Sequence, residues 1–228
     1  LIEIVSKKGW QTGIVVTSTI THATPACFYA HVDDRNKHEE IANFLPTSDV
    51  DFFAGAGLKY FNMRKDGKNL LKTFEENGFI IETESLRDFE SAEKLGFLLA
   101  PTSMPTMLEG RGNFLQEASK LALKRLTNTN GFFLMVEGSQ VDWGGHDNDA
   151  DYLIAELIDL DNTLGDILDF SEADGETLVV VTGDHETGGF TLAAKDGDYN
   201  TIVPTFSTKN HSATMVPVFA FGPGAENF

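Results

Sequence analysis

Residues 132–146 read FFLMVEGSQVDWGGH, and this stretch decides how the rest of the chain is interpreted. Its first five residues are large and apolar but too few to span a membrane, so they predict a buried strand. Glu137, Asp142 and His146 then follow within ten positions of one another. In an open α/β sheet, ligands bind beyond the carboxyl ends of the strands. The stretch therefore predicts a metal site or an acid/base site where a buried strand ends.

The composition is that of a globular protein, with 228 residues of which 41% are hydrophobic. The chain has 35 acidic and 17 basic residues, a formal charge of −18, which argues against a nucleic-acid or anionic-membrane partner. Solubility is the simplest role for this acidity. Cys27 is the single cysteine, so no disulfide forms within the chain, and the compartment stays open. The sequence contains no apolar run of membrane-spanning length, and residues 1–6 lack a signal-peptide pattern.

Strand patterns alternate with helix patterns along the chain. Apolar and β-branched runs predict strands at 12–20, 49–57, 79–81, 132–136, 177–182 and 216–222. Helical spacing and glycine stops predict helices at 1–9, 68–78, 113–126 and 152–170. Two prolines and two glycines predict a loop over 96–113. This alternation predicts one layered α/β domain over residues 1–228 with a mostly parallel sheet, and the two strands at 132–136 and 177–182 are expected to be buried.

The segment after the first predicted strand is expected to turn into a helix. Thr24 suits an N-cap and Pro25 the first helical position. The helix would then extend far enough to carry His31 and Arg35. The simplest role for His31 and for His38 is packing or exposure on a helix surface.

Three predicted strands end in clusters of polar residues: His22/Thr24, Glu137/Asp142/His146 and Asp184/His185. His211 lies by itself in a polar loop. Three carboxylates meeting in one cleft would repel by about 4 kcal/mol per pair at about 4 Å, and cations would remove that penalty. Histidine with carboxylate suits zinc, whereas a hydroxyl with carboxylate suits magnesium. N-caps and turns would explain any one cluster, but they explain the whole set poorly.

Four motifs resemble those of alkaline phosphatases in order and spacing, over nearly the whole chain: Thr21–Ala26, Val136–Asp142 with His146, Val181–Gly189, and His211. The resemblance implies a three-layer αβα sandwich. It implies one zinc held by Asp142, His146 and His211, a second zinc held by Asp184 and His185, and a magnesium held by Thr24 and Glu137. It also implies that Arg35 clamps the substrate phosphate, for which its bidentate guanidinium is suited.

His22 and Trp143 occupy positions at which the family varies, near the third metal and the phosphate-bound water, so the identity of that metal stays open. His22 either ligates the metal or hydrogen-bonds to its water. The second role is favoured, because a neutral imidazole prefers softer ions than magnesium.

The implied activity is hydrolysis of phosphate monoesters, which releases inorganic phosphate through a phosphorylated serine. The family's Asp-Ser-Ala-type motif does not occur in residues 1–228. We therefore expect a fragment without the first strand and the nucleophile-bearing helix, with little turnover alone. Family members are commonly exported and dimeric, so the resemblance implies a periplasmic or extracellular homodimer.

Two other functions stay open. One is a catalytically inactive metal-binding or interaction domain. The other is a sulfatase, phosphodiesterase or phosphomutase relative of the same superfamily, although Thr24-Pro25 and Glu137-Gly138 fit monoesterases best.

Overall fold

The computed structural model describes residues 1–127 and 130–228, and its residues form two compact units. Unit 1 comprises Leu1–Pro105 and Arg111–Glu137, and unit 2 comprises Thr106–Gly110 and Gly138–Phe228. The expectation of a single domain over residues 1–228 stays a prediction, and each unit is described by itself.

Unit 1 is built on a five-stranded sheet in the order β3-β4-β2-β1-β5. Every neighbouring pair in this sheet is parallel, which confirms the predicted α/β class with a mostly parallel sheet. Its strands are β1 (Gln11–Thr19), β2 (Phe52–Ala56), β3 (Phe79–Glu82), β4 (Lys94–Leu98) and β5 (Phe132–Glu137).

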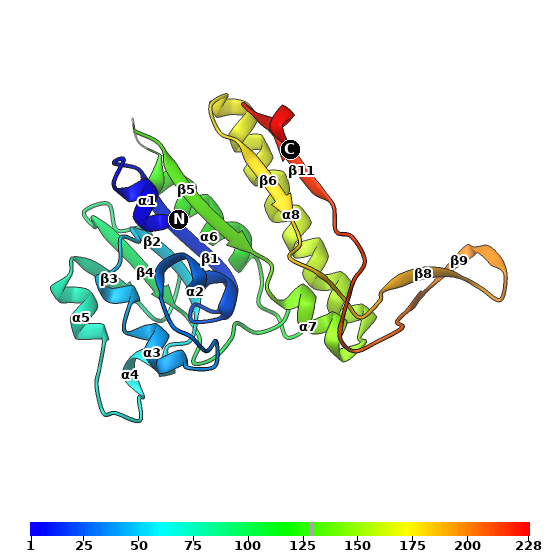
Figure 1. The fold of residues 1–228 in the computed structure, drawn as a ribbon, viewed down its shortest axis with the longest axis horizontal. Coiled ribbons are helices and arrows are strands. Elements are labelled where there is room, and N and C mark those ends of the chain that lie inside the picture. The colour runs from blue at the N-terminus through cyan, green and yellow to red at the C-terminus, as the bar shows by residue number, and fades with distance from the viewer. Residues whose placement is uncertain (128–129) are drawn as a thin grey trace. The chain divides into compact units, whose positions relative to one another are not determined.

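Helices cover both faces of this sheet (Figure 1): α1 (Ile2–Ser6), α2 (Ala23–Tyr29), α3 (His38–Ala42), α4 (Lys59–Asn62), α5 (Leu71–Glu76) and α6 (Phe114–Leu126), with a 3-10 turn η1 (Leu45–Thr47). Alternation along β1 separates the faces, because successive side chains of a strand point to opposite sides. Ile14 packs in one cluster with Ile2 of α1 and Tyr29 of α2. On the other face, Gly13 leaves space that Leu126 of α6 fills.

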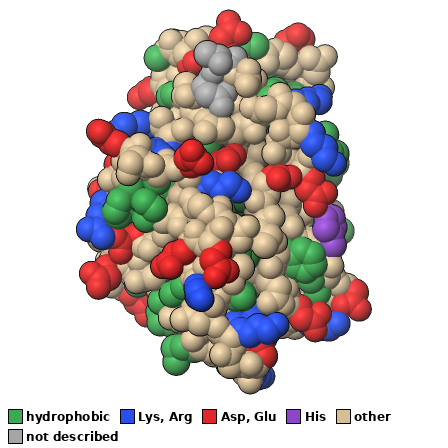
Figure 2. All heavy atoms as spheres, turned by 90° about the vertical axis from the view of Figure 1, so that its left-hand side faces the viewer, with side chains coloured by type: hydrophobic (Ala, Val, Ile, Leu, Met, Phe, Trp, Pro, Cys, Tyr) green, Lys and Arg blue, Asp and Glu red, His purple; other side chains and the backbone are tan. Residues whose placement is uncertain are grey.

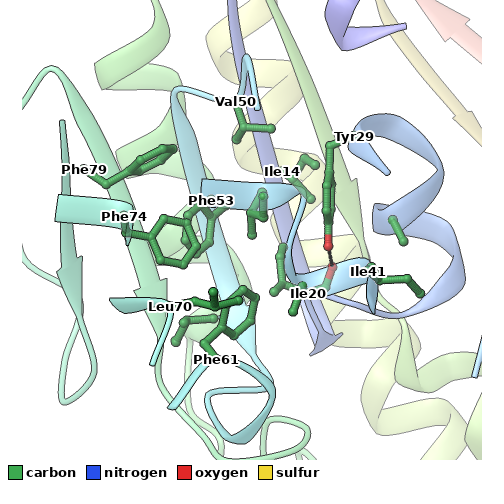
Figure 3. Packing of buried hydrophobic residues seen from close by; sticks show 14 of the residues in the cluster. Ile14, Ile20, Tyr29, Ile41, Val50, Phe53, Phe61, Leu70, Phe74 and Phe79 are labelled. Carbon is green, nitrogen blue, oxygen red and sulfur yellow. Dashed lines mark hydrogen bonds between the residues drawn. The ribbon is translucent and has the colours of Figure 1, made fainter. Parts of the chain in front are cut away.

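The core of unit 1 is a cluster of phenylalanines between the sheet and its short helices (Figure 3). Phe53 of β2 is fully buried, and its ring centroid lies 5.4 Å from that of Phe74 and 5.7 Å from that of Phe79. Gly96 is the partner of Phe53 across the β2–β4 ladder, and a Cβ at Gly96 would lie less than 3.0 Å from the Phe53 ring. The glycine is therefore required for this ring to lie across the neighbouring strand.

Unit 2 contains two consecutive helices, α7 (Gln140–Asp147) and α8 (Ala150–Asp174). The side chain of Asp149 accepts a hydrogen bond from Tyr152 N and caps α8, and Gly175 ends it with a left-handed φ of 72°. Its strands form antiparallel pairs, β6 with β11, β7 with β10 and β8 with β9, and a 3-10 turn η2 (Ala225–Asn227) follows. The strand bounds are β6 (Val179–Thr182), β7 (Glu186–Thr187), β8 (Thr191–Lys195), β9 (Asp198–Thr205), β10 (His211–Ser212) and β11 (Val218–Phe221).

Most predicted elements form where expected, but several expectations were wrong. The predicted loop over 96–113 begins too early, because Gly96–Leu98 belong to the buried strand β4. Both strands predicted as buried differ from that expectation. All six residues of β5 are only half-buried, and in β6 Val179 is buried but Val180 is 41% exposed. The helix α7 and the β8–β9 hairpin had no counterpart among the predicted elements.

The start of α2 also differs from the expectation. His22, with extended ψ, is the N-cap, so Thr24 lies within the first turn and Pro25 is the third helical residue. Proline is tolerated there because the first-turn N–H groups have no partner within the helix. The helix ends at Tyr29, so His31 and Arg35 lie in the loop that follows.

No helix among the described residues is long and apolar enough to cross a membrane. On the face drawn in Figure 2, Lys and Arg side chains are scattered among Asp and Glu side chains.

Candidate metal centre

The helix α7 presents two of the predicted ligands on one face. Asp142 and His146 are four residues apart, which places their side chains one above the other on an α-helix. Asn148, with a left-handed φ of 56°, ends the helix directly after the ligand-bearing turn. Gly145 lies between the ligands on the side where Thr187 packs, and a Cβ there would lie 2.8 Å from Thr187 O. The two glycines of this helix, Gly144 and Gly145, therefore allow close packing on its neighbours.

His211 comes from a segment 65 residues further along the chain. It lies on β10, where it is the antiparallel partner of Thr187 on β7. Because Thr187 packs against Gly145 of α7, this ladder brings His211 to the ligand-bearing face of the helix. Asp142, His146 and His211 each offer one ligand atom, and these atoms lie within 4.8 Å of one another.

The spacing of these three atoms fits a tetrahedral ion. The Nε2 atoms of His146 and His211 are 3.2 Å apart, and they lie 3.4 Å and 3.6 Å from Asp142 Oδ1. Two ligand atoms about 2.0–2.1 Å from a tetrahedral zinc lie about 3.3 Å apart. Nitrogen and carboxylate oxygen are also the donors that catalytic zinc uses. The donor set and its geometry therefore both fit zinc.

A hydrogen bond behind His146 fixes which ring nitrogen can act as ligand. Its Nδ1 lies 2.7 Å from the Lys209 carbonyl oxygen, which can only accept, so Nδ1 carries the proton and Nε2 keeps a lone pair. Metal-ligating histidines usually have such a partner on the second nitrogen.

The residues predicted for a second zinc lie next to this cluster. The ring of His185 stacks on that of His211 with centroids 3.4 Å apart, and its Nε2 lies 3.3 Å from Asp184 Oδ2. Thr187 links the two groups, because its hydroxyl donates to Asp142 Oδ1 at 2.5 Å and lies 3.1 Å from His185 Nδ1. When His185 Nδ1–H donates to this hydroxyl, Nε2 is left as the ligand atom.

Thr187 is the residue of this site that sequence reasoning missed. It belongs to the Val181–Gly189 motif, but no role was assigned to it. Its hydroxyl contacts Asp142, which is 45 residues away in the sequence, and no local pattern marks such a contact. Its position opposite His211 became visible only through the β7–β10 pairing, which spans 24 residues.

The residues predicted for magnesium lie in unit 1. The partner of Glu137 in β1 is Val16, and β1 ends at Thr19. The strands β1 and β5 are parallel and adjacent, so their carboxyl ends lie at the same edge of the sheet. Glu137 is the last residue of β5, and Thr24 lies in the first turn of α2, shortly after β1 ends. His22 caps α2 at this same edge and is half-buried. Their role as a magnesium site stays a prediction, as does the role of the half-buried Trp143 on α7 in unit 2.

Arg35 is exposed in a tight turn of unit 1. The backbone N–H of Asn36 donates to Asp34 Oδ1 at 2.9 Å, and the N–H of Lys37 donates to Asp34 O at 3.1 Å. The Asp33 carboxylate pairs with the Lys37 ammonium group at 2.8 Å. The side chains of Asp33 and Asp34 therefore both stabilise the turn. The arginine is thus held on a turn that leaves its guanidinium accessible to solvent.

The fold and the cluster define an α/β protein with three histidine and carboxylate side chains placed so that they could hold a cation. The family model for alkaline phosphatase matches residues 1–227. The chain belongs to the alkaline phosphatase family, as the four motifs had indicated.

Curated relatives of the chain include alkaline phosphatases from a bacterium and a yeast. Alkaline phosphatase 3 of Bacillus subtilis is 37% identical over 230 residues, covering 96% of this chain and 48% of that protein. The repressible alkaline phosphatase of Saccharomyces cerevisiae is 35% identical, covering 83% of this chain and 40% of that protein. The chain thus spans about half the length of the curated relatives it matches.

Solved structures agree with this assignment. Alkaline phosphatase from the Antarctic bacterium TAB5 is 55% identical, with a TM-score of 0.97, covering 100% of this chain and 69% of that chain. A histidine-to-aspartate variant of the TAB5 enzyme, with the same TM-score and identity, has magnesium bound in its M3 site.

Proposed function

We propose that the complete protein containing these residues is a metal-dependent phosphomonoesterase that forms a phosphoserine intermediate. The nucleophilic serine would belong to a segment outside the 228 residues. Family membership supports the reaction class, and the observation that carries the proposal is the zinc-like spacing of Asp142, His146 and His211. Phosphate monoesters are the substrate class, and inorganic phosphate is the product.

The proposed roles follow from the donor chemistry of each group. Asp142, His146 and His211 would hold one zinc, and Asp184 and His185 would contribute to a second. Two such metals, when bound, neutralise developing charge on the attacking and leaving oxygens and lower the pKa of bound water. Thr187 holds the Asp142 carboxylate and the His185 ring in fixed orientations through its hydroxyl.

The unit 1 residues would bind and orient the phosphate. Arg35 presents five N–H donors in a fork that matches phosphate oxygens bidentately. Thr24 and Glu137 would hold a magnesium, and His22 would hydrogen-bond to its water. The magnesium seen in the M3 site of the TAB5 variant supports a third metal site in this family. Trp143 would lie near the phosphate-bound water.

The cellular compartment and the oligomeric state of the protein are also proposals. We infer from family resemblance that the protein is exported and forms a homodimer. Light scattering of the complete protein measures its mass in solution, and fractionation of the source cells measures its location.

The test compares two aspartates of the same helix in the complete protein. Asp142→Asn should lose zinc, measured by elemental analysis, and should reduce aryl phosphate turnover by more than about 100-fold, since even residues that only orient ligands cost about 10- to 100-fold. Asp147→Asn, an exposed position on α7, is the matched control and should keep both zinc and turnover. A zinc-free wild-type protein, or full activity in Asp142→Asn, would contradict the proposal.

An inactive metal-binding domain makes a different prediction from the same samples. It would bind zinc in the wild type and lose it in Asp142→Asn, yet show no hydrolysis of any ester. Rates on a monoester, a diester and a sulfate ester separate the remaining superfamily alternatives.

A further inference from the structure

A cleft in unit 1 begins directly after Arg35. It has a volume of about 610 Å³ and is lined by Asn36–Glu40 on one side and by residues of α4 and the turn after it on the other. Figure 1 shows α3 and α4 next to each other at the lower end of this unit. None of the residues assigned to zinc, magnesium or phosphate binding lines this cleft.

The cleft gathers basic side chains in a chain that is strongly acidic. Four basic residues line it, in a protein with 17 basic and 35 acidic residues: Lys37, Lys59, Arg64 and Lys65. Three acidic residues line it as well, Glu39, Glu40 and Asp66, so the lining has one more basic than acidic side chain. Lys37 pairs with Asp33 at 2.8 Å, and Arg64 pairs with Asp66 at 2.7 Å. Among the described residues, Lys59 and Lys65 have no carboxylate oxygen within 4.0 Å of their ammonium groups. Their charges are therefore available to an anion that enters the cleft.

The walls of the cleft are fixed by buried contacts. The side chain of Arg64 is 2% exposed, and its Nη1 donates to the carbonyl oxygens of Glu39 at 2.8 Å and Tyr60 at 3.0 Å. The guanidinium thus ties the two walls together. The Lys59 ammonium lies 4.9 Å from the centroid of the Tyr60 ring, which keeps it against the wall. A preorganised charge loses less conformational entropy when an anion binds.

His38 connects the cleft to the edge of the sheet that carries the proposed phosphate and magnesium residues. Its ring stacks on Tyr60 with centroids 4.6 Å apart, and its Nδ1 lies 3.0 Å from Thr21 Oγ1, three residues before Thr24. Burial lowers the pKa of His38, and the nearby charges of Lys59 and Arg35 lower it further, against a hydrogen bond to Thr21 that raises it.

We propose that this cleft is a subsite for a second anionic group of the substrate, with the Lys59 and Lys65 ammonium groups as its contacts. The inference rests on the proposed function, because it takes Arg35 as the clamp for the phosphoryl group that is transferred. Substrates of this class carry a second phosphate beside the transferred phosphoryl group. In a nucleoside diphosphate the bond broken is the phosphoanhydride, water supplies the oxygen, and the leaving group is the nucleoside monophosphate. Aryl phosphates with an uncharged aryl group lack the second anionic group and leave the subsite empty.

The test uses the complete protein and compares two double variants with the same change in charge. Lys59→Gln/Lys65→Gln removes the two free charges of the cleft, and Lys7→Gln/Lys8→Gln removes two exposed charges just after α1. The measured quantity is kcat/KM for a nucleoside diphosphate divided by kcat/KM for an aryl phosphate. We expect the cleft variant to lower this ratio about tenfold, mainly through KM, and to lose the effect at about 1 M salt. The control variant should keep the ratio of the wild type.

The outcomes separate the subsite from the proposed function. An unchanged ratio in the cleft variant, or an equal fall in both variants, overturns the subsite. If the wild type hydrolyses neither the nucleoside diphosphate nor the aryl phosphate, the proposed function fails. Binding of inorganic pyrophosphate, measured by calorimetry, then decides whether the cleft is an anion site. Weaker pyrophosphate binding in the cleft variant alone supports an anion site, and equal binding in all three proteins overturns it.

Discussion

Strand β2 of unit 1 and strand β11 of unit 2 have similar apolar sequences but very different surroundings. All five residues of β2 are buried, whereas Val218, Phe219 and Phe221 of β11 are 52%, 63% and 44% exposed. β2 lies inside a five-stranded sheet, and β11 pairs only with β6 among the described residues. An apolar run therefore predicts a strand, but the neighbours decide its burial. We infer that unit 1 is stabilised mainly by its apolar core and that the α7–β10 region of unit 2 is stabilised mainly by cation binding.

The largest expected effect comes from truncating the central phenylalanine of unit 1. Phe53→Ala should lower the free energy of unfolding by about 3–5 kcal/mol, because it leaves a cavity in a close-packed cluster. Phe219→Ala is the matched change on β11 and should cost much less, since that side chain is 63% exposed. Urea unfolding of the chain measures both values. Equal losses in the two variants would show that the burial contrast does not govern stability.

A second effect tests the cross-strand pair of Phe53 and Gly96. Gly96→Ala places a Cβ less than 3.0 Å from the Phe53 ring and should cost about 1–3 kcal/mol through overpacking. Gly165→Ala, inside α8 with no atom within 4 Å of the new Cβ, is the control. It should stabilise by about 0.5–1 kcal/mol through helix propensity. Stabilisation by both substitutions would contradict the described packing of β4 on β2.

The hydroxyl of Thr187 should matter for zinc affinity and little for the fold of unit 1. Thr187→Val removes the donor to Asp142 Oδ1 and should weaken zinc binding about 10- to 100-fold, as loss of an orienting partner usually does. Thr201→Val, exposed on β9, should leave the affinity unchanged. Competition with a chromogenic chelator measures the dissociation constants. An unchanged affinity in Thr187→Val would remove Thr187 from the site.

The smallest expected effect is a pH dependence in unit 1. Hydrogen bonds from Arg64 lower the pKa of Asp66 from its ordinary 3.8 to about 2, with a further contribution from the Lys68 N–H. A carboxyl group whose pKa is lower in the folded state stabilises above its unfolded pKa, and this stability is lost as pH falls through the folded pKa. Asp66→Asn should therefore lower Tm at pH 7, and the difference from wild type should vanish between pH 3.8 and about 2. The exposed Asp161→Asn serves as control. A difference that stays constant down to pH 2 would contradict the ion pair.

The sequence predicted the class of fold because the periodicity of strands and helices is a local property. Residues such as Phe53 and Phe133 mark strands wherever they lie, and α6 was predicted within one residue of its observed bounds. The start of the loop predicted over 96–113 was wrong, because the place of Gly96 in β4 depends on its packing against a ring from the neighbouring strand. Helix α7 was not predicted, because its end at Asn148, a residue with left-handed φ, has no local signal in the sequence.

The site was predictable to the extent that its ligand types form recognisable motifs. Asp142, His146 and His211 were named from the sequence and lie together in the structure. Their spacing and the hydrogen bond from Thr187 depend on the β7–β10 ladder, which no local pattern encodes. The cleft beside Arg35 was also hidden, because His38 and Tyr60 are ordinary packing residues until their stacking is seen.

The most direct test of this contrast is hydrogen exchange of the complete protein, measured with saturating zinc and after treatment with a chelator. Stabilisation by a ligand reaches about 2.7 kcal/mol when its concentration is 100 times the dissociation constant. We predict that zinc slows exchange in α7 and at His211–Ser212, and that it leaves the amides of β2 unchanged. Asp142→Asn should abolish the difference. Unchanged exchange in α7, or equal slowing in α7 and β2, would contradict the account.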